Sequence, residues 1–217
     1  MRVNSMDHIP WQLRQLLVEH WGIFVGERIE QGWKGYLVTF TFNKLAGGER
    51  AILEQMRNEI ERFYASLVKR VVRKPTSPNW QHKLPILIGC PDFAGSRHGR
   101  RTLQDLTING GLHFHVIILI PAQSRLREGL IKHIQLNYDT YRGERKRIST
   151  IDLQRITDAP GSVVGYSQKA FKSGRFLHDH LLVLPKALSE LPEKGDNDGE
   201  YEFSTKKSWL TQFSPDY

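Results

Sequence analysis

Two histidines at the start of the longest apolar run in the chain have the type and spacing to bind a metal ion. His113 and His115 are separated by one residue within the segment 110–121. If this segment is a β-strand, alternate side chains share a face, and the two Cα atoms lie roughly 6.6–7 Å apart. Imidazoles on one face can converge on a single cation. The opposite face then carries apolar side chains for a helix-covered core, namely Leu112, Phe114, Val116, Ile118 and Ile120.

A second reactive pair lies in the segment 160–172, which is predicted to be a helix that opens at Pro160. Tyr166 and Lys169 are three residues apart and therefore share a helix face. An ammonium group beside a phenol stabilises the phenolate, which makes the tyrosine a better nucleophile. Taken alone, this spacing favours a buried aromatic with a lysine that reaches the surface.

Together, the two motifs resemble those of the HUH endonucleases. His113-Phe114-His115 matches the histidine–hydrophobe–histidine signature of that family, and Tyr166-Ser167-Gln168-Lys169 matches its Tyr-x-x-Lys motif. The segment 36–42 looks like the first conserved strand of the family's replication initiators. These segments occur in the family's order and cover about residues 36–172. The chain resembles the single-tyrosine, rolling-circle type, because Ser162 and Ala170 stand where a second tyrosine would lie.

The resemblance implies an enzyme that nicks and joins single-stranded DNA at a specific sequence. His113 and His115 would hold Mg²⁺ or Mn²⁺, which polarises the scissile phosphate. Tyr166 would attack the phosphorus and form a 5′-phosphotyrosine intermediate. Lys169 would help to deprotonate the phenol or neutralise the developing charge. The reaction would initiate rolling-circle replication of a plasmid or phage.

A hard, octahedral ion needs more ligands than two histidines provide. Asp92, just past the second predicted strand, is the best candidate for a third ligand. His98 and Cys90 are weaker candidates, since a thiolate suits a softer metal. A second His-x-His, His178-Asp179-His180, has a charged middle residue and follows the tyrosine helix, so we interpret it as a decoy.

The predicted elements place these residues in an α+β fold. Strands are expected at 36–42, 84–90, 110–121 and 148–156, and helices at 5–21, 49–73, 125–136 and 160–172. The segment 178–185 is expected to be a last short strand or an extended segment, and breaks are expected at Gly22 and Gly26. The order strand–helix–strand–strand–helix–strand predicts a ferredoxin-like or RRM-like sandwich. It has a central antiparallel sheet, helices on one face and the other face available to a ligand. We expect an N-terminal helical extension (1–35), an endonuclease domain (36–185) and a largely mobile tail (186–217).

The charge of the chain favours a polyanionic partner. The formal net charge is +8 over 217 residues, and an excess of this size is typical of nucleic-acid binding. The expected partner is single-stranded DNA or a DNA hairpin at an origin. The expected phosphate contacts are Arg97, Arg100, Arg101, Arg145, Lys146 and Arg147. A Gly-x-x-x-x-Gly-Lys loop does not occur, so strand unwinding would need a separate helicase.

Other classes explain less of the sequence. A single-tyrosine HUH transposase would use the same motifs, and an RRM-like nucleic-acid-binding module would leave the histidines and Tyr166 without a role. A cupin would place an acid shortly after the histidines, and a histidine-triad hydrolase would need histidine at Ile117.

The single cysteine and the lack of a signal-like or membrane-spanning apolar segment predict a cytoplasmic protein without a membrane partner.

Overall fold

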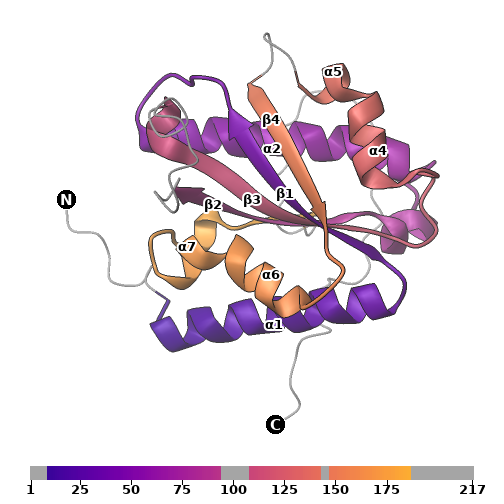
Figure 1. Cartoon of the computed structure of the whole chain (residues 1–217), viewed down its shortest axis with the longest axis horizontal. Helices are drawn as coiled ribbons and strands as arrows, with labels where there is room; N and C mark the ends of the chain where they lie inside the picture. Colours follow the sequence, from indigo (N-terminus) through magenta and orange to yellow (C-terminus); the bar gives the residue numbers. More distant parts are fainter. Residues whose placement is uncertain (1–8, 94–107, 143–146, 187–217) are drawn as a thin grey trace, which may run out of the picture. The chain divides into compact units, whose positions relative to one another are not determined.

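A five-stranded antiparallel sheet forms the centre of the molecule (Figure 1). The computed structural model describes residues 9–93, 108–142 and 147–186. The strands are β1 (Lys34–Phe42), β2 (Ile86–Phe93), β3 (Leu112–Ile120), β4 (Ile148–Arg155) and β5 (Leu182–Leu184), in the order β4-β1-β3-β2-β5. The first four strands have the order of a ferredoxin-like sandwich, which confirms the predicted α+β class.

Helices connect the strands and cover the sheet. The α-helices are α1 (Trp11–Glu30), α2 (Glu49–Val71), α4 (Gly129–Leu136), α5 (Tyr138–Tyr141), α6 (Pro160–Ser167) and α7 (Lys169–Lys172). The 3₁₀ turns are η1 (Pro78–Lys83), η2 (Ile108–Gly111) and η3 (His178–His180). In the described residues, no helix combines the length and apolar content needed to cross a membrane.

The larger apolar core lies between the sheet and α2. Apolar residues recur along α2 at spacings of three and four, so they form a stripe on one side of the helix. Phe63 in this stripe packs edge-on against Phe40 of β1, with ring centroids 5.0 Å apart. Val116 and Ile118 of β3 point into the same core, as predicted from the alternation of the strand.

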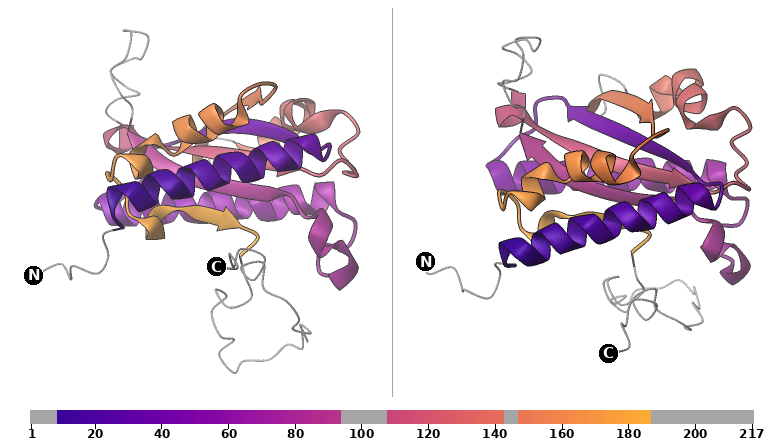
Figure 2. Two further views of the ribbon diagram at one scale, coloured as in Figure 1. Left: turned by 90° about the horizontal axis from the view of Figure 1, so that it is seen from below. Right: turned by 60° about the horizontal axis from the view of Figure 1, so that its bottom comes forward.

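The opposite face of the sheet is also covered, by α1, α6 and α7 (Figure 2). Val18 of α1, Val164 of α6 and Phe171 of α7 are buried with Ile117 and Leu119 of β3. The expectation of helices on one face only is therefore wrong. The physical reason is that β3 is apolar on both faces, and a strand of this kind must be buried on both sides.

Two glycines in α1 allow this second layer to pack closely. The expected breaks at Gly22 and Gly26 do not occur, because the helix continues to Glu30. A Cβ atom at Gly22 would lie 3.0 Å from the Cα of Gly161 in α6, closer than such contacts normally are. Gly22 is thus explained by the close approach of two helices, and α1 belongs to the packed fold.

Two boundaries differ from the sequence prediction in ways that affect the site. β2 continues beyond Cys90 to Phe93, so Asp92 is a strand residue. The predicted helix at 160–172 is interrupted at Gln168, which separates α6 from α7. Residues up to Leu184 form one unit, and Pro185–Tyr217 form a second unit, of which the described residues are Pro185 and Lys186.

Candidate metal centre and nucleophile

The strand register brings the polar candidates onto the same face of the sheet. In the pairing of β2 with β3, Asp92 lies opposite His113 and Cys90 lies opposite His115. In the pairing of β1 with β3, Thr39 lies opposite His115. Directly opposed residues of antiparallel strands point to the same face, and their Cβ atoms are about 5 Å apart. These polar residues therefore lie on the same face of the sheet as the apolar residues Ile117 and Leu119.

Asp92, His113 and His115 form the group of described residues that could hold a metal ion. The Nε2 atoms of the two histidines are 3.1 Å apart. Asp92 Oδ2 lies 3.5 Å from His115 Nε2 and 3.7 Å from His113 Nε2. All three side chains are buried.

These separations fit a shared cation. Adjacent ligands of an octahedral ion with bonds of about 2.1 Å lie about 3 Å apart. The other oxygen of Asp92, Oδ1, is buried and accepts no hydrogen bond among the described residues. A buried acceptor of this kind is costly unless something satisfies it, and a metal ion would do so. The structure therefore supports the predicted ligands, including Asp92.

A tight turn before β3 orients His113. Asn109, Gly110 and Gly111 all have positive φ, at 55°, 64° and 78°, which is a conformation that favours glycine and asparagine. The turn directs the Gly111 carbonyl at His113 Nδ1, at 3.1 Å. A carbonyl only accepts hydrogen bonds, so Nδ1 carries the proton in the neutral ring. Nε2 of His113 then presents its lone pair to the cluster.

Thr39 orients His115 in a similar way. Its Oγ1 lies 3.1 Å from His115 Nδ1. A hydrogen bond between Nδ1 and a polar partner fixes the tautomer and ring orientation of a metal-binding histidine. Thr39 was not among the residues predicted from the sequence to take part in the site. The signal was available, because β1 and β3 are neighbours in a ferredoxin-like sheet.

Lys169 connects the cluster to the predicted nucleophile. Its Nζ lies 2.7 Å from Asp92 Oδ2 and 4.8 Å from the centroid of the Tyr166 ring. Burial raises the pKa of Asp92, but hydrogen bonds from His115 and Lys169 and the charge of Lys169 outweigh it and lower the pKa to about 2. Asp92 is thus a carboxylate at neutral pH and can act as a ligand.

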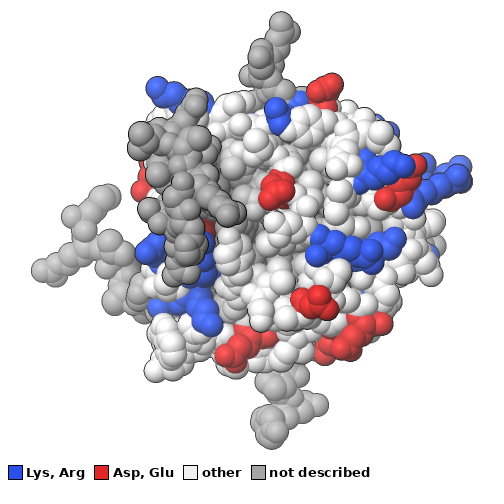
Figure 3. Space-filling view, in the orientation of Figure 1, with Lys and Arg blue, Asp and Glu red and all other residues white. Residues whose placement is uncertain are grey.

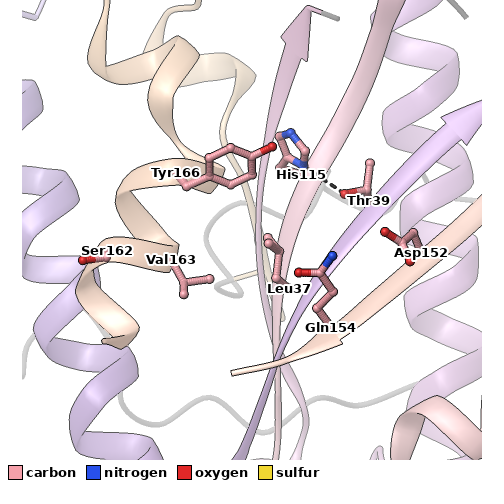
Figure 4. Close-up of a pocket in the computed structure, with 8 residues that line it drawn as sticks. All are labelled: Leu37, Thr39, His115, Asp152, Gln154, Ser162, Val163 and Tyr166. Atoms are coloured by element: carbon pink, nitrogen blue, oxygen red, sulfur yellow. Dashed lines mark hydrogen bonds between the residues drawn. The ribbon is translucent and has the colours of Figure 1, made fainter. Parts of the chain in front are cut away.

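Tyr166 lies at the edge of the cluster and is 46 % exposed. Its ring centroid is 5.0 Å from that of His115, and its hydroxyl end points toward His115 (Figure 4). The sequence predicted that Tyr166 and Lys169 share a face, and the structure confirms that they are close although the helix is interrupted between them.

An open pocket of about 450 Å³ lies beside Tyr166 and His115. Ser162, Val163 and Tyr166 of α6 form one wall, and Asp152 and Gln154 of β4 form the other (Figure 4). Leu37 and Thr39 of β1 lie between the two walls. Asp152 and Gln154 were not predicted from the sequence, because neither residue belongs to a motif.

The other predicted residues have different positions. Cys90 is buried beside the cluster, and burial raises the pKa of its thiol to about 12, so it is protonated at neutral pH and a poor ligand. Arg147 is exposed at the start of β4. His98 and five of the predicted DNA contacts lie outside the described residues, namely Arg97, Arg100, Arg101, Arg145 and Lys146.

The second His-x-His does not form part of the cluster. His178 and His180 lie in the turn η3, and the metal-compatible group of described residues excludes both. His180 Nδ1 instead lies 2.8 Å from Asp179 Oδ1.

Comparisons with known proteins found no relative of this chain. The chain matches no protein-family model, and no curated protein or solved structure is significantly similar to it. Its function must therefore be inferred from its motifs and its geometry.

Proposed function

We propose that this protein is a metal-dependent endonuclease that cleaves single-stranded DNA through a covalent bond to Tyr166. The observation that carries the proposal is the position of Tyr166, an exposed phenol beside a buried Asp92-His113-His115 cluster. A tyrosine in the protein core would be covered, whereas this one faces solvent and a pocket. The HUH-like order of the motifs supports the same conclusion.

The donor set favours Mn²⁺ over Mg²⁺ as the activating ion. Two imidazole nitrogens and one carboxylate oxygen bind first-row transition metals better than Mg²⁺, which prefers oxygen ligands. His113, His115 and Asp92 would hold the ion. When bound, it would polarise a non-bridging oxygen of the scissile phosphate.

The chain's own residues supply the nucleophile. The Tyr166 oxygen forms a bond to phosphorus while the bond from phosphorus to the 3′-oxygen breaks. The phenol loses its proton to solvent, and the leaving 3′-oxygen takes up a proton to become a hydroxyl. The phosphate ester bond is exchanged rather than hydrolysed, so the step is reversible and can rejoin strands without another energy source.

Lys169 has two roles in this proposal. Its ammonium lies over the Tyr166 ring, where its positive charge would stabilise the negative charge that develops in the transition state. Its ion pair with Asp92 holds the carboxylate in place beside the two histidines. Lys169 therefore links the position of the nucleophile to that of the ligands.

Initiation of rolling-circle replication is the biological role that the motif resemblance favours. The substrate would be single-stranded DNA or a hairpin at an origin, with a separate helicase to unwind the duplex and a cytoplasmic location where such DNA replicates. A single-tyrosine transposase would use the same chemistry on the ends of a mobile element. Mapping the nicked phosphodiester on the DNA that carries the gene separates the two roles.

Covalent capture of DNA tests the proposal. The protein is incubated with a pool of single-stranded DNA and Mn²⁺ and then run on a denaturing gel. We expect a band of slower mobility that is lost with EDTA and with Tyr166→Phe. Tyr141→Phe is a matched control, because Tyr141 is a buried tyrosine in the core on the α2 side of the sheet. DNA binding without any covalent band would favour the RRM-like binding module instead.

A further inference from the structure

The pocket beside Tyr166 has a second wall that the proposed chemistry does not use. Asp152 and Gln154 are two residues apart on β4, so they point to the same face. Both side chains are exposed, and neither side chain makes a hydrogen bond or ion pair with another described residue. Their hydrogen-bonding capacity is therefore available to a ligand.

Asp152 is close enough to the metal centre to contact the same substrate. It lies opposite Thr39 on β1, and Thr39 lies opposite His115 on β3. Two strand spacings separate Asp152 from His115, or roughly 9–10 Å. This is the scale of the separation between a phosphate and the base of an adjoining nucleotide.

A carboxylate in this place is unsuited to the phosphate backbone. Like charges repel, so Asp152 would oppose a phosphate group placed against it. Over the middle of β1 and β4, an isolated acidic group lies in a largely uncharged area, and basic groups lie toward the ends of these strands (Figure 3). An acceptor in such surroundings suits the hydrogen-bond donors of a base.

We propose that Asp152 and Gln154 form a subsite that selects guanine next to the scissile phosphate, an inference that rests on the proposed endonuclease function. A carboxylate only accepts hydrogen bonds, and guanine is the base whose Watson–Crick edge has two adjacent donors, N1–H and the N2 amino group. Gln154 can donate its amide to O6 of the same base. Leu37 and Val163 supply apolar surface for the ring (Figure 4).

The other bases fit this wall less well. Adenine and cytosine place a ring-nitrogen lone pair beside their amino group, which would face one oxygen of the carboxylate. Thymine has one donor between two carbonyl oxygens. Single-stranded bases are commonly recognised on this edge, and a two-bond contact discriminates by about tenfold or more.

Sequencing of the cleaved strands tests the subsite. The full chain is incubated with Mn²⁺ and a randomised pool of single-stranded DNA, and both the captured and the released fragments are sequenced. We expect guanine at one position beside the cut, at least about tenfold over other bases. Asp152→Asn should remove this preference. Asp158→Asn is the matched control, since it removes the same charge just after β4 and does not line the pocket.

Base analogues show which atoms of the guanine the subsite recognises. With wild-type protein, inosine in place of the selected guanine lacks the N2 amino group and should lower capture about tenfold. The analogue 7-deazaguanine keeps the Watson–Crick edge and should have no effect. Asp152→Asn should respond equally to guanine and inosine.

Each outcome distinguishes the two proposals. Capture without a guanine preference, or with equal capture of guanine and inosine by the wild-type protein, overturns the subsite and leaves the endonuclease intact. If no strand in the pool is captured, the endonuclease proposal fails, and the subsite fails with it.

Discussion

The chain contains two His-x-His sequences, and their surroundings differ in every respect that matters for metal binding. His113 and His115 lie in a central strand, where alternate residues share a face, and their Nε2 atoms meet 3.1 Å apart. His178 and His180 lie in a 3₁₀ turn, in which residues two apart point about 120° away from each other. Spacing alone therefore does not make a site, because the backbone conformation decides whether two imidazoles converge.

The side-chain partners of the two histidine pairs differ as well. His113 and His115 are buried, each has an oxygen partner for Nδ1, and both lie within 4 Å of Asp92. His178 is exposed, and His180 is next to the exposed Asp179. A pair that is partly open to solvent can stay hydrated at little cost, whereas a buried group of ligands gains from a bound ion.

The largest difference between the two histidine pairs is expected in Mn²⁺ affinity, when one buried histidine is replaced. We expect His115→Ala to weaken Mn²⁺ binding by more than about 100-fold, beyond what loss of an outer partner usually costs. His180→Ala should leave the affinity unchanged. Electron paramagnetic resonance of free Mn²⁺ measures both, and equal effects of the two substitutions would refute the assignment.

Removal of the Thr39 hydroxyl tests whether the partner of His115 contributes. Thr39→Val keeps the shape of the side chain and should weaken Mn²⁺ binding by about tenfold. Thr41→Val is the matched control, because Thr41 is on the same face of β1 and hydrogen-bonds Thr150 rather than a histidine. Titration of both variants with Mn²⁺ provides the comparison, and a loss in Thr41→Val as large as in Thr39→Val would contradict the role of Thr39.

The Lys169–Asp92 pair should give a pH-dependent contribution to stability in the metal-free protein. The folded-state pKa of Asp92 is lowered to about 2, so its contribution is present above about pH 4 and is lost as the pH falls toward 2. Lys169→Met should lower the free energy of unfolding by about 1 kcal/mol at neutral pH, a figure reduced for the partial exposure of the lysine.

Urea unfolding at several pH values measures this difference. The gap between Lys169→Met and wild type should close between about pH 4 and pH 2, where Asp92 becomes protonated in both proteins. Lys172→Met, on the same short helix, should show no such pattern. A gap that is constant over the whole range would show that Asp92 is not responsible.

The smallest effect is expected at the exposed acid between the second pair of histidines. Asp179→Asn removes the contact to His180 and should change the free energy of unfolding by less than about 0.5 kcal/mol, as for other exposed pairs. Mn²⁺ affinity should not change. A measurable loss of metal binding in this variant would mean that the second pair contributes to the site.

Much of the fold followed from periodicity in the sequence. The elements β1 and α2 and the apolar face of β3 were expected from the sequence, and the strand–helix order predicted the sheet. The second helical layer was missed, although Ile117 and Leu119 on the histidine face of β3 already required a cover. Gly22 was predicted to break the helix. The prediction was wrong because a glycine that breaks a helix and a glycine that allows close helix packing look alike in the local sequence.

The site residues that belong to local sequence motifs were predictable. Those that are brought into the site by the pairing of strands were not. His113 and His115, and likewise Tyr166 and Lys169, followed from short spacings in the sequence. Asp92 was placed after a strand rather than in it, and its ion pair with Lys169 depends on contacts far apart in the sequence. Asp152 gave no local signal at all, since its position opposite Thr39 exists only in the folded sheet.

The nature of the covalent bond is the most direct test of the account. Wild-type protein incubated with Mn²⁺ and single-stranded DNA is digested with nuclease and protease, and its peptides are analysed by mass spectrometry. We expect a nucleotide linked through phosphate to Tyr166, and we expect this adduct to be absent when His115 is replaced by alanine. A nucleotide on another residue, or unmodified Tyr166 in protein that has cleaved DNA, would contradict it.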